Sequence, residues 1–112
     1  MAKDKVYLNH ILDSINSISM FTNGMDKKAF SEDEVVINAV IRMLEIIGEA
    51  ANNISNELKI KYPNVPWKKI TGTRNNLIHE YFNVDLDLIW KTITINLPEL
   101  KEKVIEIIKK TS

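Results

Sequence analysis

A chain of 112 residues with 45% hydrophobic and 27% charged residues has the size and composition of one globular domain, which excludes a disordered or fibrous protein. Its 15 basic and 15 acidic side chains cancel, so the global charge favours no particular partner. The chain has no cysteine, which excludes disulfides and thiolate chemistry. We therefore expect one domain over residues 1–112.

The ends and apolar runs of the chain suggest a cellular location. The N-terminal stretch MAKDKVYLNHILDS has no apolar core and no small-residue cleavage site, so we expect no signal peptide. No apolar run approaches the roughly 18 residues that a bilayer-spanning helix needs. With no cysteine present, these features predict a soluble cytoplasmic protein.

The first two predicted helices follow from apolar side chains repeated at intervals of three and four. Residues 4–20 have this amphipathic spacing, and TNGMDKK then breaks it. A capping box of Ser31 and Glu34 predicts the start of a long second helix, which should run to about Leu58. Its apolar positions cover most of the circumference, so we expect burial on more than one side.

The second half of the chain contains the turn signals. YPNVPWKKITG predicts a loop and a short helical turn at 67–70, followed by a helix over 73–82. Asp85 is an expected N-cap for the last helical segment, which Pro98 should kink or divide near Asn96 and Leu97. No alternation of period two appears. The pattern predicts an all-α fold, a four- to five-helix up-and-down bundle.

The stretch TRNNLIHEYF, residues 73–82, combines the side chains best suited to chemistry. A guanidinium, as in Arg74, binds phosphate with a fixed fork of donors, and the imidazole of His79 can exchange protons near neutral pH. Asn75 and Tyr81 add polar groups close by. Lysines at 59, 61, 68 and 69 precede the motif, and residues 58–79 contain no acidic side chain. The set suits metal-free RNA cleavage by attack of a ribose 2′-hydroxyl on its own phosphate.

Structural roles compete with this interpretation. An arginine and a histidine on one helix are more often surface or capping side chains, and Trp67 and Trp90 are by default core or interface aromatics. Glu45 and Glu49 would by default form a solvated seam or pair with Arg42. A metal site is not expected, because the motif supplies one histidine and Glu80 but no second ligand pair at suitable spacing.

The motif and its flanks resemble a known family. RNNLIHEY, preceded by VPWKKITGT and followed by FNVDLDLIWKTITINLPEL, is similar to the HepT-like branch of the HEPN domain superfamily. The earlier RMLEIIGEAANNIS resembles the Gly-Glu-Ala helix of that branch. The resemblance covers nearly the whole chain and is weakest over residues 1–30.

The resemblance implies a HEPN-type homodimer whose motif helices face a shared cleft. It implies a metal-independent endoribonuclease toxin of a type II toxin-antitoxin system, without a cofactor, in which Arg74 and His79 match the catalytic pair. Asn75 and Glu49 match supporting positions, and we expect Glu49 to pair with Arg74. Tyr81 matches the tyrosine that a partner, an MntA-like nucleotidyltransferase antitoxin, modifies with AMP.

Two further expectations complete the sequence-based interpretation. Lys68 and Lys69, in the basic stretch before the motif, are expected to bind RNA. The alternative function is a non-catalytic subunit that binds a nucleotide or docks on a nucleotidyltransferase, and a helical dimer without any site also fits the spacing.

Overall fold

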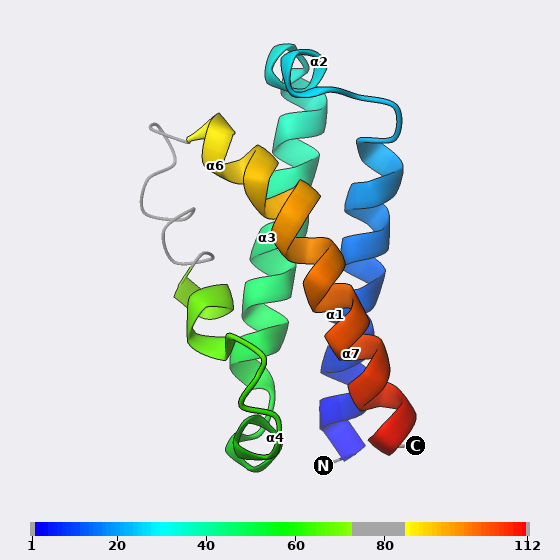
Figure 1. Cartoon of the computed structure of the whole chain (residues 1–112), viewed down its shortest axis with the longest axis vertical. Helices are drawn as coiled ribbons and strands as arrows, with labels where there is room; N and C mark the ends of the chain where they lie inside the picture. Colours follow the sequence, from blue (N-terminus) through cyan, green and yellow to red (C-terminus); the bar gives the residue numbers. More distant parts are fainter. Residues whose placement is uncertain (1, 73–84, 112) are drawn as a thin grey trace.

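Two long antiparallel helices form the framework of the molecule. The computed structural model describes residues 2–72 and 85–111, and its helices are α1 (Ala2–Phe21), α2 (Lys27–Glu32), α3 (Glu34–Asn53), α4 (Asn56–Lys61), α6 (Leu86–Lys91) and α7 (Leu97–Thr111), with an unlabelled helix over 67–72. Figure 1 shows α1 and α3 side by side along the longest dimension. At 20 residues each, they extend about 30 Å.

The core lies between α1, α3 and α7. Helix α7 runs antiparallel to α1 across the front of the molecule (Figure 1). Its buried side chains recur at intervals of three and four, as the amphipathic pattern predicts, at Leu97, Leu100, Val104 and Ile107. One hydrophobic cluster joins them to buried residues of α1, α3, α4 and α6. The all-α prediction is confirmed for the described residues, and the homodimer stays a prediction.

The start of the second long helix differs from its prediction. Ser31 lies inside the short helix α2, which Asp26 caps by accepting a hydrogen bond from the Ala29 amide at 2.8 Å. Asp33 is the cap of α3, because its carboxylate accepts a hydrogen bond from the Val36 amide. The predicted capping box at Ser31 is therefore wrong. Where the start of one helix was predicted, two helices begin, and each is capped by an aspartate three residues before the amide that it binds.

Helix α3 also ends earlier than Leu58, at Asn53. The Asn53 side chain donates to the Glu49 carbonyl at 3.0 Å, a local bond that competes with continued helix. Ile54 then adopts an extended conformation and enters the core, and Ser55 caps the new helix α4. Burial of α3 on more than one side is confirmed by Ile41 and Ala50, which are nine positions apart and so lie on opposite sides of the helix at roughly 100° per residue.

A buried carboxylate joins α1 to this break. Asp4 is only 4% exposed, and it accepts hydrogen bonds from the Ser55 amide at 2.8 Å and the Ser55 hydroxyl at 2.6 Å. The same hydroxyl oxygen accepts the Leu58 amide at 3.2 Å. A continuous chain of hydrogen bonds thus fixes the first turn of α1 to the first turn of α4.

Pro98 interrupts the last helical segment close to the predicted place. Residues Thr92–Asn96 form a π-helical turn, η2, and the Leu97 amide donates to the Thr92 carbonyl five residues back. Proline lacks an amide hydrogen and its ring clashes with the carbonyl four residues earlier, so a regular α-helix cannot continue through it. The hydroxyls of Thr92 and Thr94 also donate to carbonyls four residues back, which bends helices.

The described helices have one further property relevant to location. None of them combines the length and the hydropathy that crossing a bilayer requires.

Replacing Asp4 with alanine should lower the free energy of unfolding by about 2–4 kcal/mol, because the Ser55 amide and hydroxyl each lose a partly buried acceptor. Urea unfolding followed by circular dichroism measures this change. The matched control is Asp13→Ala on the same helix, where the side chain is exposed. Equal stability of the two variants would contradict the role of Asp4.

Candidate functional site

The motif residues lie between two well-defined helical segments. Arg74, Asn75, His79 and Tyr81 fall within 73–84, outside the described residues, so the predicted helix over 73–82 stays a prediction. What the structure defines is how the chain enters this stretch and how it leaves it. Helix 67–72 leads into it and Asp85 follows it.

The entrance to the motif is fixed by Trp67. Its ring is 7% exposed, and its indole Nε1–H donates to the Tyr62 carbonyl at 3.0 Å. The Trp67 amide also donates to the Val65 carbonyl at 2.8 Å. The interpretation of Trp67 as a core aromatic is therefore confirmed, and the predicted turn at 67–70 extends to residue 72. The buried ring of Trp67 and the hydrogen bond from its indole nitrogen together fix the start of this helix.

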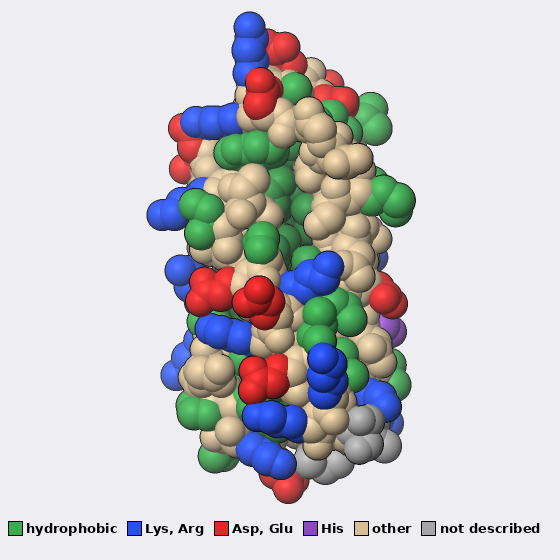
Figure 2. Space-filling model, turned by 45° about the vertical axis from the view of Figure 1, so that its right-hand side comes forward, with side chains coloured by type: hydrophobic (Ala, Val, Ile, Leu, Met, Phe, Trp, Pro, Cys, Tyr) green, Lys and Arg blue, Asp and Glu red, His purple; other side chains and the backbone are tan. Residues whose placement is uncertain are grey.

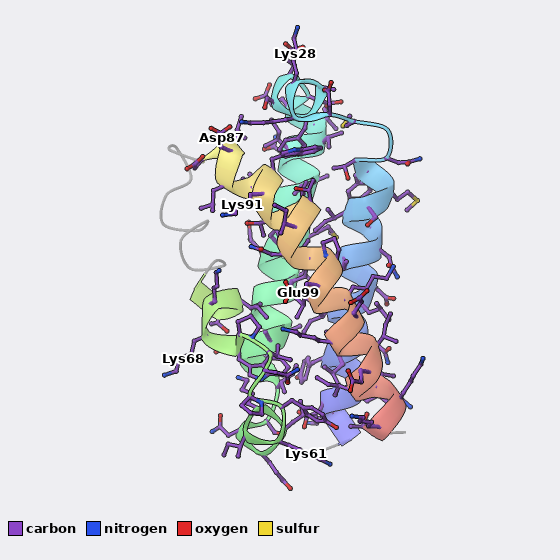
Figure 3. The ribbon with its side chains drawn as sticks, in the orientation of Figure 1. Lys28, Lys61, Lys68, Asp87, Lys91 and Glu99 are labelled. Carbon is purple, nitrogen blue, oxygen red and sulfur yellow. The ribbon has the colours of Figure 1, made fainter. Side chains whose placement is uncertain are left out.

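Lys68 and Lys69, the predicted RNA-binding residues, are exposed on helix 67–72. Figure 3 shows Lys68 directed away from α3. Exposed ammonium groups immediately before the motif are accessible to a polyanion. Contact with RNA stays a prediction.

The exit from the motif is fixed by α6 and its contacts with α2. Asp85 caps α6 as predicted, with its carboxylate accepting the Leu88 amide at 3.1 Å. Trp90 packs against Phe30 of α2 with ring centroids 5.3 Å apart, which confirms its aromatic packing role. Lys27 and Asp87 form an ion pair at 2.6 Å, although both side chains are largely exposed, so it adds little stability.

Glu49 lies on the polar seam of α3. Its side chain is exposed, while its neighbours Gly48 and Ala50 are buried. The default interpretation of this seam is confirmed in part by an Arg42–Glu45 ion pair at 3.7 Å. The expected pairing of Glu49 with Arg74 involves a residue outside the described part of the chain and stays a prediction.

The sequence analysis did not identify the long-range contacts that join α1 to α4 and α2 to α6. Asp4 and Ser55 are 51 positions apart, and Lys27 and Asp87 are 60 apart, so no local spacing relates them. The sequence analysis identified the Asp85 cap but expected the long second helix to continue through Ser55.

The Trp67→Phe substitution should destabilise the protein by more than about 1 kcal/mol, because a smaller phenyl ring replaces the buried indole and the hydrogen bond to the Tyr62 carbonyl is lost. Trp90→Phe is the control, since its aromatic contact with Phe30 can be kept by phenylalanine. Thermal unfolding of both variants tests the difference. A smaller effect at Trp67 than at Trp90 would contradict this account of the anchor.

Comparison with known proteins identifies the family. The model of the family described as "Ribonuclease HepT-like" matches residues 11–107. "Putative RNase MJ1380" of Methanocaldococcus jannaschii is 45% identical over 100 residues, covering 89% of this chain and 92% of that protein. "Putative RNase TTE0752" of Caldanaerobacter subterraneus subsp. tengcongensis is 43% identical over 110 residues, covering 98% of each chain.

A third relative has a more specific name. "Probable ribonuclease HepT" of Thermococcus cleftensis is 43% identical over 99 residues, covering 88% of this chain and 90% of that protein. No solved structure matches the chain. Because the family model spans most of the sequence, including the whole motif, the chain belongs to the HepT-like ribonuclease family.

Proposed function

We propose that the protein is a metal-independent endoribonuclease whose catalytic residues are Arg74 and His79. The observation that carries the proposal is the family match over residues 11–107, which includes the complete RNNLIHEY motif. The ribonuclease names of relatives in three organisms support the same reaction class. The exposed Lys68 and Lys69 immediately before the motif are consistent with a polyanionic substrate.

The proposed reaction uses groups already present in RNA and in the motif. A base, His79, takes the proton of a ribose 2′-hydroxyl, whose oxygen attacks the adjacent phosphorus. The bond to the 5′-oxygen of the next nucleotide breaks, and that oxygen receives a proton. Arg74 stabilises the negative charge that develops on the phosphoryl oxygens. Because the nucleophile is part of the substrate and the guanidinium supplies the positive charge, a metal ion is not needed.

A second copy of the chain is part of the proposal. On a helix with roughly 100° per residue, Arg74 and Tyr81 share one side, whereas His79 lies about 140° from Arg74. One straight helix therefore does not aim both groups at one phosphate. Two motif helices that face each other across a two-fold axis would border a common cleft with both pairs. We accordingly propose a homodimer with the substrate bound between the protomers.

We further propose that the ribonuclease is a toxin neutralised at Tyr81. Its partner is an MntA-like nucleotidyltransferase antitoxin that attaches AMP to the tyrosine hydroxyl. The helical spacing puts Tyr81 on the same side as Arg74, so the added phosphate would lie beside the guanidinium. An anion there would occupy the position that the substrate phosphate needs.

Replacing His79 with alanine should reduce the rate of RNA cleavage in EDTA by roughly 100- to 10,000-fold, the usual contribution of a general acid or base. His10→Ala is the matched control, because His10 is the chain's only other histidine and is exposed on α1. Gel analysis of labelled RNA measures both rates.

The same assay separates the proposal from its alternative. If intact RNA persists with the unsubstituted protein, while a tight complex with the nucleotidyltransferase survives Arg74→Ala and His79→Ala, the protein is a non-catalytic binding subunit. Cleavage that is equally fast in His79→Ala would exclude this histidine from the reaction.

Treatment with the nucleotidyltransferase and Mg-ATP should add the mass of an AMP group and abolish cleavage, whereas Tyr81→Phe should remain active and unmodified. Intact-mass spectrometry and the RNA assay provide the two measurements. Tyr7→Phe is the control, because it removes a different hydroxyl, on α1 and outside the motif. Modification that persists in Tyr81→Phe would move the acceptor to another residue.

A further inference from the structure

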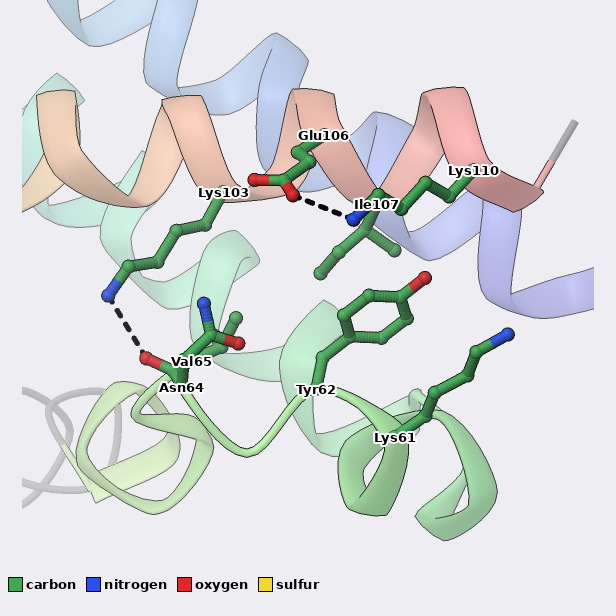
Figure 4. A pocket seen from close by; sticks show the side chains of 8 residues that line it. All are labelled: Lys61, Tyr62, Asn64, Val65, Lys103, Glu106, Ile107 and Lys110. Atoms are coloured by element: carbon green, nitrogen blue, oxygen red, sulfur yellow. Dashed lines mark hydrogen bonds and ion pairs between the residues drawn. The ribbon is translucent and has the colours of Figure 1, made fainter.

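A polar hollow lies between α7 and the loop that follows α4. Its volume is about 290 Å³, and its lining includes Lys61 and Tyr62 from one side and Lys103, Glu106 and Lys110 from α7. Figure 4 shows Tyr62 pointing from the loop toward α7, with Lys61 on one side and the Lys110–Glu106 pair above it. None of these residues belongs to the RNNLIHEY motif.

The hollow carries an excess of positive charge. Three lysines and one glutamate line it, which leaves a formal charge of +2. Lys103 donates to the Asn64 carbonyl at 3.0 Å and approaches Glu99 at 3.5 Å, and Lys110 donates to Glu106 at 2.8 Å. Each ammonium has three donors, so both lysines can bind a further acceptor. Among the described residues, Lys61 has no carboxylate partner within ion-pair distance.

The two groups of the α7 ion pair keep their charges at neutral pH. The hydrogen bond from Lys110, together with its charge, lowers the pKa of Glu106, and the same interaction raises the pKa of Lys110. A phosphate that approaches the hollow would therefore meet a charged ammonium at Lys110. Competition with Glu106 is weak, because exposed ion pairs contribute little free energy.

An aromatic ring stands among these charges. Tyr62 is half-buried, packs against the hydrophobic core and also lines the hollow. The Lys61 ammonium lies 5.8 Å from its ring centroid, near the outer limit of a cation–π contact. A planar base could displace this exposed side chain and stack on the ring. A stacking surface surrounded by cations is the arrangement by which proteins bind single-stranded nucleic acid.

We propose that this hollow is a second anchor for the RNA substrate, which stacks a base on Tyr62 and binds the flanking phosphates through Lys61 and Lys110. The inference rests on the proposed function, because it takes RNA as the ligand of the motif. The chain supports a continuous path: the loop lining the hollow leads directly into helix 67–72, which carries exposed Lys68 and precedes the motif in the sequence.

The distribution of basic side chains favours RNA binding at the end of the molecule that contains α4 and the end of α7. On the face in Figure 2, lysine and arginine side chains are most numerous in the lower half, the half that contains α4 and the end of α7 in Figure 1. The opposite end carries α2. An acidic protein segment would satisfy the lysines but would leave the aromatic ring without a planar partner, so RNA fits the lining better.

The test measures binding of a fluorescein-labelled 20-residue oligouridylate to the full chain carrying His79→Ala, in EDTA, over a series of salt concentrations. Lys61→Gln with Lys110→Gln removes the proposed phosphate contacts. Lys27→Gln with Lys28→Gln is the matched control: it also removes one lysine paired with a carboxylate and one exposed lysine, but on α2. Circular dichroism checks that each variant is folded.

The affinity of the variant with Lys61→Gln and Lys110→Gln should depend less steeply on salt. The magnitude of its slope of log affinity against log salt should fall by about 1.4, since each lysine–phosphate contact with a single strand contributes roughly 0.7. The control should leave the slope unchanged. Tyr62→Leu, which keeps apolar packing, should weaken binding roughly 5- to 150-fold through lost stacking. Equal slopes in the two double variants would overturn the proposal, and so would wild-type affinity in Tyr62→Leu.

Two further results distinguish this inference from the proposed function. If the chain with His79 intact cleaves RNA and the variant with Lys61→Gln and Lys110→Gln matches the control in binding and in KM, the anchor is wrong and the ribonuclease stands. If no cleavage occurs but oligouridylate binding still depends on Lys61, Lys110 and Tyr62, the anchor stands and the catalytic proposal fails. If the variant with Lys61→Gln and Lys110→Gln no longer binds the nucleotidyltransferase but binds RNA as before, the hollow is a site for a protein partner and the proposal is overturned.

Discussion

The buried carboxylate of Asp4 sets the geometry on which the second half of the chain depends. A charge removed from water is tolerated only when it is hydrogen bonded, and Ser55 supplies both its amide and its hydroxyl to Asp4. These two hydrogen bonds hold the residue that caps α4, two positions after α3 ends. Everything that follows, including the loop to Trp67 and helix 67–72, begins from a point fixed against α1.

Rigid support also connects the fold with the chemistry proposed for the motif. Cleavage of a phosphodiester needs a cation and a proton carrier held in a defined arrangement, and such precision comes from rigid support. Trp67 on one side and Asp85 with α6 on the other provide anchors in the core and in a helix cap. The proposed reaction therefore depends also on residues that need not touch RNA themselves.

Periodicity was sufficient to predict α1 and the body of α3, because long helices repeat their apolar positions several times, while the last helical segment was predicted from the Asp85 cap and Pro98. It could not predict α2 or α4, which have six residues each and depend on single caps at Asp26 and Ser55. Residue types alone left a structural role for the motif open, and its family was recognised only because the flanking segments resemble that family as well. Long-range contacts such as Asp4–Ser55 were not recognised, since they join positions with no relation in local spacing.

The π-helical turn at Thr92–Asn96 joins α6 to α7 and sets the rotation of one helix relative to the other. An α-helix advances by roughly 100° per residue, so deletion of one residue here would rotate α6 relative to α7 by about that angle. The core face of α7 would stay in register, while Asp85 would be carried around to another side. Sequence-length variation in homologous proteins should therefore be strongly restricted at this turn, even though several of its side chains are exposed.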